Sequence, residues 1–577
     1  MLKLLPYLKG YRVKTILGPL FKLVEAILEL LVPVVVAKII DEAIPAGRAG
    51  DYSLLTKYGV YMLALAAVGL LFALVAQYFA SRASMGFGTN LRKGLYEHIN
   101  TLSQADVDKF GAPSLMTRLV GDTTQCQQGV AMFIRLVTRA PFVVIGSIIM
   151  AITIAPKLSL IFIGASLLIA IILYFIMSHS FRAYGIARGL LDDVSLSVRE
   201  NLNGVRVIRA FSRGDREKAE FNRKNDKMTS ISIAIGNVSN LTNPASYAII
   251  NIAVILVLWL GGKQVYYGNL SQGSIIALVN YLTQIMIALA VLANLVVTFS
   301  RASASAKRIN EVFATPSSRL GGDGAAPDYS APAIEVKNLA FTYAGNSKST
   351  LSGINITIEK GQTLGIVGGT GSGKSTLVQL IAGLYDVTDG EINLFGHPVS
   401  QYTAAEKNAL IGFAMQKSVL FSGTIKSNLL WRKPTASDDE LIAAIKTAQA
   451  YEFVSKKPGG LDEPVVEGGN NFSGGQKQRL NVARALVGKP DILILDDSSS
   501  ALDFATDAAL RKSLREDCKG MTTVVISQRA TSMQAMDLIL VMDDGAIVGA
   551  GTHAELLASC PEYREIYNSQ VAEEDRV

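Results

Sequence analysis

The decisive stretch of this sequence reads Gly368-Gly369-Thr370-Gly371-Ser372-Gly373-Lys374-Ser375. It fits the pattern G-x-x-x-x-G-K-[ST] of a loop that holds phosphate groups. The residues from Thr363 to Val367 are apolar enough for a buried strand, and those from Thr376 to Leu384 have helical spacing. A strand before the loop and a helix after it are the context that the motif requires. We therefore predict a phosphate-binding loop at this position.

The residue types in this loop explain how phosphate would bind. Glycines let backbone N–H groups turn toward phosphate oxygens, and the N-terminus of the following helix favours negative charge. Lys374 is expected to reach the β- and γ-phosphates, and the hydroxyl of Ser375 is expected to ligate Mg²⁺. One half of the chain is therefore predicted to bind a nucleoside triphosphate.

The composition indicates a membrane protein with more than one domain. The chain has 577 residues, of which 50% are hydrophobic and only 18% are charged. This is too apolar for a soluble enzyme of the same loop type. The net charge of +7 is better explained by basic cytoplasmic loops beside a membrane than by nucleic-acid binding. The three cysteines, Cys126, Cys518 and Cys560, have no metal or disulfide spacing.

The first half of the chain contains stretches that are long and apolar enough to span a bilayer. We predict six spans: Thr15–Ile40, Tyr58–Phe79, Val137–Ala155, Leu158–Met177, Ala245–Leu260 and Ile275–Phe299.

The connections between the spans predict the orientation in the membrane. Those after spans two and four are long, and the second is rich in Lys and Arg. The positive-inside rule predicts that the two long connections, both termini and the nucleotide-binding half lie in the cytosol. The membrane is then the cytoplasmic (inner) membrane. Both connections are expected to be helical, each with one break, at Gly111-Ala112-Pro113 and at Asn203-Gly204. Met1 to Lys14 is expected to form an amphipathic helix on the inner membrane face.

Two acidic residues lie inside the first span. Glu25 and Glu29 are four residues apart and therefore share one helix face. One interpretation is that they meet cationic amphipathic cargo. The other, which we favour, is that they pair with Lys22 or with a basic residue such as Arg135 or Arg139.

The second half of the chain carries further motifs. Residues 314–332 are rich in Pro, Gly, Ser and Ala and predict a linker between a transmembrane domain at 1–313 and a nucleotide-binding domain at 333–577. The strand Asp491–Asp496 ends in a carboxylate, the Walker B arrangement that holds Mg²⁺. A highly specific motif precedes it: Phe472-Ser473-Gly474-Gly475-Gln476.

With these motifs the chain resembles the ATP-binding cassette (ABC) exporters over nearly its whole length. The resemblance implies an all-α transmembrane domain of six long helices fused to an α/β P-loop cassette that hydrolyses ATP. It further implies that two cassettes close head to tail, so that each ATP lies between the phosphate loop of one and the signature motif, Phe472 to Gln476, of the other. Gly111–Asp122 and Glu200–Arg213 look like the coupling helices that contact the cassettes.

The resemblance also assigns roles to single residues. Tyr343 resembles the aromatic residue that stacks on adenine, and Thr376 belongs to the ATP-binding loop. Gln416 resembles the glutamine that touches Mg²⁺ and senses the membrane domain. The implied magnesium ligands are thus Ser375, Gln416 and, through water, Asp496.

Two catalytic positions depart from the family pattern. The residue after Asp496 is normally Glu, which activates the attacking water, but here it is Asp497. The switch residue is normally His, but here it is Gln528. Together these changes resemble the degenerate half of heterodimeric bacterial multidrug exporters. We therefore predict a second half-transporter as partner and hydrophobic or amphipathic small molecules as cargo. The alternative is a homodimeric exporter of lipid or peptide with slow hydrolysis at both sites. The six predicted spans exclude a soluble ABC ATPase that acts on DNA.

Overall fold

The computed structural model describes residues 1–317, 322, 324–529 and 532–570. The chain divides into two compact units, one formed by 1–97 with 113–314 and the other by 98–112 with 315–577. The chain therefore passes between the units at three points: Glu97/His98, Ala112/Pro113 and Ala314/Thr315. Unit 1 and unit 2 below refer to these two parts.

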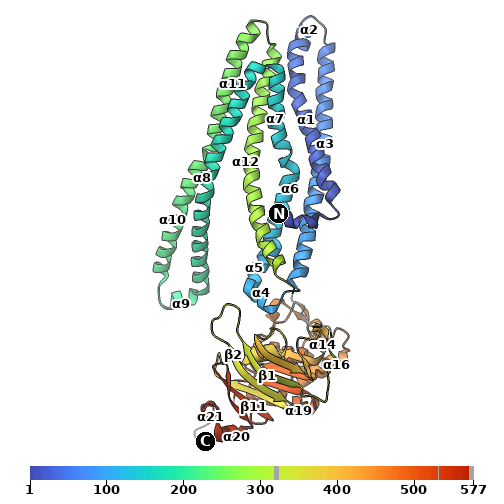
Figure 1. Ribbon diagram of the computed structural model, residues 1–577, viewed down its shortest axis with the longest axis vertical. Coiled ribbons are helices and arrows are strands. Elements are labelled where there is room, and N and C mark those ends of the chain that lie inside the picture. The colour runs from blue at the N-terminus through green and yellow to red at the C-terminus, as the bar shows by residue number, and fades with distance from the viewer. Residues whose placement is uncertain (318–321, 323, 530–531, 571–577) are drawn as a thin grey trace. The chain divides into compact units, whose positions relative to one another are not determined.

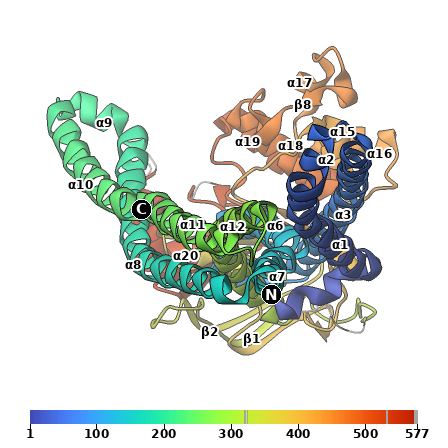
Figure 2. The ribbon, with the colours of Figure 1, turned by 90° about the horizontal axis from the view of Figure 1, so that it is seen from above.

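Unit 1 is entirely helical in its described part (Figure 1). Its elements are η1 (Leu2–Leu8), α1 (Arg12–Lys38), η2 (Ile39–Ala43), α2 (Ile44–Arg48), α3 (Ser53–Ile99), α5 (Ala112–Thr117), η3 (Arg118–Asp122), α6 (Thr123–Met132), η4 (Phe133–Val137), α7 (Arg139–Ile154), α8 (Pro156–Asn203), α9 (Val205–Ala210), α10 (Gly214–Asn240), α11 (Thr242–Tyr266) and α12 (Gln272–Ala314). Apolar side chains of α1, α7, α8, α11 and α12 form the core of unit 1, and the hydroxyl of Tyr281 donates to the Leu30 carbonyl at 2.6 Å. Helices α8 and α10 run side by side, and α9 joins them at one end (Figures 1 and 2).

Five helical stretches of the described chain are long and apolar enough to cross a membrane, where the sequence predicted six spans. They are Ser53–Ile99, Ala112–Ile154, Pro156–Ile176, Gly214–Tyr266 and Gln272–Ala314. The first expected span forms α1, which packs against α7 and α12. It differs from the other five because charged side chains recur along it, at Lys22, Glu25, Glu29 and Lys38.

The N-terminus differs from the expected amphipathic surface helix. Leu2–Leu8 forms a 3₁₀ helix whose Leu4 and Leu8 side chains are buried. The ring of Tyr7 stacks on Phe313 of α12 at 5.5 Å. Leu4, Leu8 and Tyr7 therefore pack into unit 1, whereas Leu2 and Leu5 of the same segment are exposed.

The long connections are helical as predicted, but each has a second break. The first is interrupted after Ile99 as well as at Gly111, and the second at 211–213 as well as at Gly204. The short helix that follows Ile99 is α4 (Gln104–Phe110), which belongs to unit 2.

In the first connection, the helix that belongs to unit 2 is α4, which lies just before the predicted Gly111–Asp122. Its N-cap Ser103 accepts a hydrogen bond from the Asp106 amide, and Gly111 ends it with φ 76°. The hydroxyl of Tyr385 donates to Asp108 at 2.5 Å, which attaches α4 to the sheet-containing part of unit 2. Residues from Pro113 onward continue into unit 1. In the second connection, α9 lies inside the predicted Glu200–Arg213.

Unit 2 is built on two main sheets. The six-stranded sheet has the order β12-β11-β3-β10-β9-β6 and is parallel except for β12, while the four-stranded sheet β2-β1-β4-β5 is antiparallel. A third, small sheet pairs β7 with β8. The strands are β1 (Ile334–Phe341), β2 (Leu351–Ile358), β3 (Thr363–Gly368), β4 (Asp389–Leu394), β5 (His397–Pro398), β6 (Ile411–Ala414), β7 (Gly423–Thr424), β8 (Pro464–Val465), β9 (Ile492–Asp496), β10 (Thr522–Ile526), β11 (Leu538–Asp543) and β12 (Ala546–Gly551).

Helices and short turns of unit 2 connect these strands. They are α13 (Lys374–Ile381), α14 (Ala404–Leu410), α15 (Ile425–Leu429), α16 (Asp438–Thr447), α17 (Tyr451–Ser455), η5 (Gly460–Asp462), η6 (Glu467–Gly469), α18 (Gly474–Leu486), α19 (Phe504–Asp517), α20 (His553–Ser559) and α21 (Pro561–Asn568). Because β3, β9, β10 and β6 are neighbouring parallel strands, the loops after their carboxyl ends meet at one edge of the sheet.

The predicted linker is partly packed. Helix α12 ends at Ala314 and β1 begins at Ile334. Between them, the ring of Tyr329 packs edge-on against Phe395 at 5.0 Å, and the Lys360 ammonium lies over that ring. The part of 314–332 near Tyr329 is therefore attached to unit 2, because the Tyr329 ring packs against Phe395 and Lys360.

Candidate nucleotide-binding and hydrolysis site

The phosphate loop follows the buried strand β3 and turns directly into α13. Gly371 and Gly373 have φ 87° and 95°, conformations that L side chains rarely adopt. At Gly368 a Cβ would lie 2.1 Å from the Met542 carbonyl oxygen, so no side chain fits there. The Lys374 ammonium folds back over the loop and donates to the carbonyls of Gly368 and Gly369 at 2.9 and 2.6 Å. The loop is therefore a tight backbone turn with the Lys374 ammonium group at its centre.

The end of β9 brings the Walker B carboxylate to this loop. The Ser375 hydroxyl donates to Asp496 at 2.9 Å. Burial raises the pKa of the Asp496 carboxyl, the neighbouring Asp497 raises it further, and the Ser375 hydrogen bond opposes this. Burial also lowers the pKa of Lys374, against the charges of Asp497 and Asp496.

These residues fit the magnesium nucleotide that the cassette implies. A buried carboxylate beside a hydroxyl is the oxygen donor set that Mg²⁺ prefers. Turned backbone amides and a lysine are the groups that bind phosphate oxygens. A bound Mg²⁺ would also offset the cost of burying the Asp496 and Asp497 carboxylates side by side. Ser375 and Asp496 would hold the metal, while Lys374 and the loop amides would hold the phosphates.

The predicted adenine-stacking residue lies close to this loop. The Tyr343 hydroxyl is 3.1 Å from Thr376 Oγ1, and its ring packs edge-on against Phe341 and Tyr385. Thr376 is itself buried. Tyr343 is therefore positioned beside the first turn of α13, and the stacking on adenine remains a prediction.

The position after Asp496 has an unusual backbone. Asp497 adopts φ 46°, and its amide donates to the Ile526 carbonyl at 3.1 Å. Burial raises the pKa of Asp497, whereas Gln416 and the charges of Lys374 and Arg529 lower it. Asp497 is therefore a buried carboxylate at the end of β9, where the base is expected, and Gln416 follows β6 with an exposed side chain.

The switch residue Gln528 follows β10 and has an exposed side chain. Its backbone carbonyl accepts from the Gln570 side chain at 2.7 Å. Within the described residues, no hydrogen bond joins the Gln528 side chain to Asp497.

The signature motif forms the start of α18. Ser473 is its N-cap, and a reciprocal capping box joins the Ser473 hydroxyl to the Gln476 amide and the Gln476 side chain to the Ser473 amide. Phe472 is buried beside Phe453. At Gly475 a Cβ would lie 3.0 Å from the Ala501 carbonyl oxygen, whereas at Gly474 it would meet only the Ala501 methyl at 3.7 Å. In the described part of the chain no hydrogen bond links this motif to the chain's own phosphate loop.

Comparison with known proteins agrees with both halves of the structure. The family model described as ABC transporter transmembrane region matches residues 15–289, and the one described as ABC transporter matches 351–500. An uncharacterised ABC transporter ATP-binding protein of Mycobacterium tuberculosis is 36% identical over 569 residues, which is 98% of this chain and 97% of that protein. The chain is a half-transporter of the ABC exporter family.

Other relatives agree with this assignment. The probable multidrug resistance ABC transporter ATP-binding/permease protein YheI of Bacillus subtilis is 31% identical over 570 residues, covering 98% of this chain and 96% of that protein. The solved structure of a bacterial Atm1-family ABC exporter with ATP bound has a TM-score of 0.81 at 23% identity, covering 97% of this chain and all of that one. The exporter fold, a helical transmembrane domain with an α/β ATPase domain, is thereby confirmed. Such exporters work as dimers in the membrane.

The sequence did not reveal how this exporter half holds its D-loop, the segment after Walker B. The Gln478 side chain donates to Ser500 Oγ at 3.0 Å and accepts from the Ala501 amide at 2.9 Å. Gln478 is on α18, so the signature helix and the D-loop are fastened together. No local pattern signals a contact between residues so far apart in sequence.

The two acidic residues of α1 are paired. Lys22 contacts Glu25 at 2.6 Å, and Arg139 contacts Glu29 at 2.7 Å. These ion pairs are the ones expected if the two carboxylates have a structural role. Arg135, the other basic residue considered, lies in η4.

Proposed function

We propose that this exporter half works in a heterodimer, in which it contributes a degenerate ATP site of its own and an intact signature motif to the partner's site. The observation that carries the proposal is the contrast between the two motifs. The base and switch positions hold Asp497 and Gln528, whereas the signature keeps Ser473 and its capping box.

The chemistry of Asp497 supports slow hydrolysis at the chain's own site. Asp is one methylene shorter than the usual Glu, and a misplacement of about 1 Å can cost about 10²-fold in rate. Loss of positioned general base catalysis costs about 10²–10⁴-fold. Gln528 can hydrogen-bond but cannot carry an imidazolium charge. The partner would supply the missing Glu and His opposite this chain's Ser473.

The roles of the other residues follow from the site. Lys374 and the loop amides would bind the phosphates of ATP, and Tyr343 would contact the adenine. Mg²⁺, when bound, would offset phosphate charge; Ser375 would ligate it, with Gln416 and, through water, Asp496. Head-to-tail closure of two cassettes would then be transmitted by the coupling helices to the membrane helices.

The proposed cargo is a hydrophobic or amphipathic small molecule, exported through the cytoplasmic (inner) membrane. Apolar spans and the multidrug label of YheI, a relative at 31% identity, support this class. The basic second connection supports a cytosolic location of the ATPase domain and of both termini. Glu25 and Glu29 would serve the helix bundle more than the cargo, given their ion pairs.

Purification of the chain from its native membranes tests the heterodimer. We expect a second half-transporter with intact Glu and His to accompany it, and Asp497→Ala to leave most of the ATPase activity of the pair. Recovery of the chain with copies of itself alone, together with silencing by Asp497→Ala, would instead establish a homodimer.

A further inference from the structure

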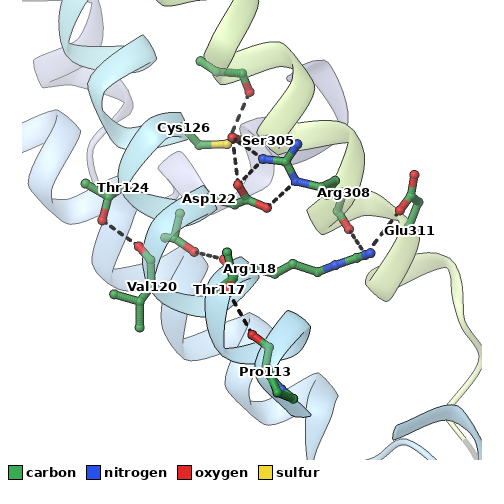
Figure 3. Close-up of polar contacts among 12 residues, drawn as sticks. Pro113, Thr117, Arg118, Val120, Asp122, Thr124, Cys126, Ser305, Arg308 and Glu311 are labelled. Atoms are coloured by element: carbon green, nitrogen blue, oxygen red, sulfur yellow. Dashed lines mark hydrogen bonds and ion pairs between the residues drawn. The ribbon is translucent and has the colours of Figure 1, made fainter. Parts of the chain in front are cut away.

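A buried carboxylate joins two distant segments of unit 1 (Figure 3). Asp122 ends η3, and its side chain is only 4% exposed. It accepts hydrogen bonds from the Ser305 hydroxyl at 2.9 Å, from Arg308 Nε at 2.8 Å and from Arg308 Nη2. Both donors are on α12, so three hydrogen bonds and one ion pair connect α12 to η3 through a single side chain.

A second arginine makes the connection reciprocal. Arg118, at the other end of η3, donates from Nη1 to the Arg308 carbonyl at 2.7 Å and contacts Glu311 at 3.2 Å (Figure 3). Arg308 of α12 thus binds Asp122 of η3, and Arg118 of η3 in turn binds the backbone of α12. Beside this contact, Cys126 and Ala302 pack closely enough for the Cys126 thiol to reach the Ala302 carbonyl at 3.5 Å.

The geometry of η3 is also unusual for a helix. Arg118–Asp122 is a π-helical turn, as are Ile39–Ala43 and Phe133–Val137 elsewhere in unit 1. Such turns are rare and often occur at functional positions.

The location of this cluster on the chain suggests its role. The chain enters unit 1 at Pro113, shortly before Asp122, and leaves it at Ala314, shortly after Arg308. The contacts of Asp122, Arg118 and Arg308 therefore connect the segments next to two of the three points at which the chain passes between the units.

We propose that Asp122 and Arg308 are positioning residues. Their ion pair holds the segment that enters unit 1 at Pro113 to the segment that leaves it at Ala314, so that both segments move together and ATP-driven motion is converted into rearrangement of the membrane helices. The pair belongs to unit 1 and is not among the residues assigned to the ATP site, which are in unit 2. The proposal rests on the exporter family alone and is independent of whether the partner is a different chain or a second copy.

The charges of Asp122 and Arg308 matter more for this connection than the volumes of their side chains. With Asn at position 122, a neutral amide replaces the buried carboxylate, and Arg308 loses its ionic partner. With Lys at position 308, the charge stays but the two parallel donors of the guanidinium are lost. Both changes loosen the connection without altering the ATP site.

The experiment measures coupling in the purified exporter, reconstituted into proteoliposomes, with ethidium as the transport probe. The quantity is ethidium transported per ATP hydrolysed, for Asp122→Asn, Arg308→Gln and the double variant. We expect each single change to lower this ratio about tenfold, within the range that positions along a coupling network can produce. The ATPase rate should stay within about threefold, and the double variant should be no worse than the single ones because both remove one contact.

A second readout needs no cargo. Spin labels at Ala49→Cys and Asn269→Cys, both in exposed loops of unit 1, report the helix rearrangement as a distance change on adding ATP with vanadate. Cys518 and Cys560 are replaced by Ser, and Cys126 is fully buried. Asp122→Asn should reduce the shifted population by at least half while hydrolysis continues.

The matched control is Glu220→Gln, the same type of change in the surface ion pair Glu220–Arg223 of α10; it should leave both readouts unchanged. If Asp122→Asn fails to fold, Arg308→Lys gives the test, with an expected loss of about threefold in the ratio. The proposal is overturned by an unchanged ratio and distance shift, by losses that multiply in the double variant, or by ATPase and transport that fall in equal proportion.

Discussion

Substitution of Gly475 tests the geometry of the signature motif most sharply. A Cβ at this position would lie 3.0 Å from the Ala501 carbonyl oxygen, tighter than ordinary van der Waals contact, so the D-loop must yield by a few tenths of an ångström. The D-loop cannot yield freely, because Gln478 holds both Ser500 and Ala501. The strain therefore falls on the start of α18, where Ser473 would face the partner's ATP.

The rate loss can be estimated from this displacement. A 1 Å misplacement costs about 10²-fold, so a few tenths of an ångström correspond to about five- to tenfold for Gly475→Ala. For Gly475→Asp the larger side chain and its negative charge beside the γ-phosphate should bring the loss to about 10²-fold or more.

The assay is steady-state ATPase of the purified pair, one mutation at a time, with thermal unfolding as a check on folding. Gly474→Ala is the control within the same motif, since its Cβ meets only the Ala501 methyl at an ordinary 3.7 Å. It should lose less activity than Gly475→Ala. Ala is the better helix former at both positions, so Gly474→Ala should not lower the unfolding temperature, whereas the contact with Ala501 opposes this gain in Gly475→Ala.

Two results would refute this reasoning. A greater loss for Gly474→Ala than for Gly475→Ala would show that the Ala501 contact is not the constraint. Tolerance of Gly475→Asp in a pair that Asp497→Ala silences would contradict the proposed division of labour between the two sites.

Other changes test the remaining assignments. Lys374→Ala should weaken ATP binding at the chain's own site and reduce transport without abolishing it; unchanged nucleotide affinity of the pair, measured by titration, would contradict the loop assignment. Asp497→Glu should raise ATP hydrolysis modestly and the double change with Gln528→His further, toward the 10²–10⁴-fold that positioned base catalysis supplies; no gain in single-turnover hydrolysis would place the limit elsewhere in the site. Changing both Glu25 and Glu29 to Gln should reduce export of cationic and neutral dyes equally, because the ion pairs with Lys22 and Arg139 are structural; a selective loss of cationic dyes in vesicle transport would assign the acids to cargo.

Local patterns were sufficient for the ATP motifs. The glycine spacing from Gly368 to Gly373 specifies a turn that only residues without a Cβ can make, and Ser473 with Gln476 has the spacing of a capping box. The sequence alone predicted the phosphate loop and the signature motif, because both depend on residues within one turn of each other; the capping box became evident only in the structure.

Contacts between distant residues were decided by the tertiary structure. The break at Gly111 was visible in the sequence, but the choice of α4 as the docked helix depends on Asp108 meeting Tyr385. The sequence offered several basic residues as partners for Glu25 and Glu29. Helix packing decided that Glu25 pairs with Lys22 and Glu29 with Arg139. Nothing in the sequence indicated a role for Asp122, because its ion-pair partner Arg308 is on α12, far along the chain. Residue types and spacing determine what short segments can do, whereas burial and helix packing determine which distant charges meet.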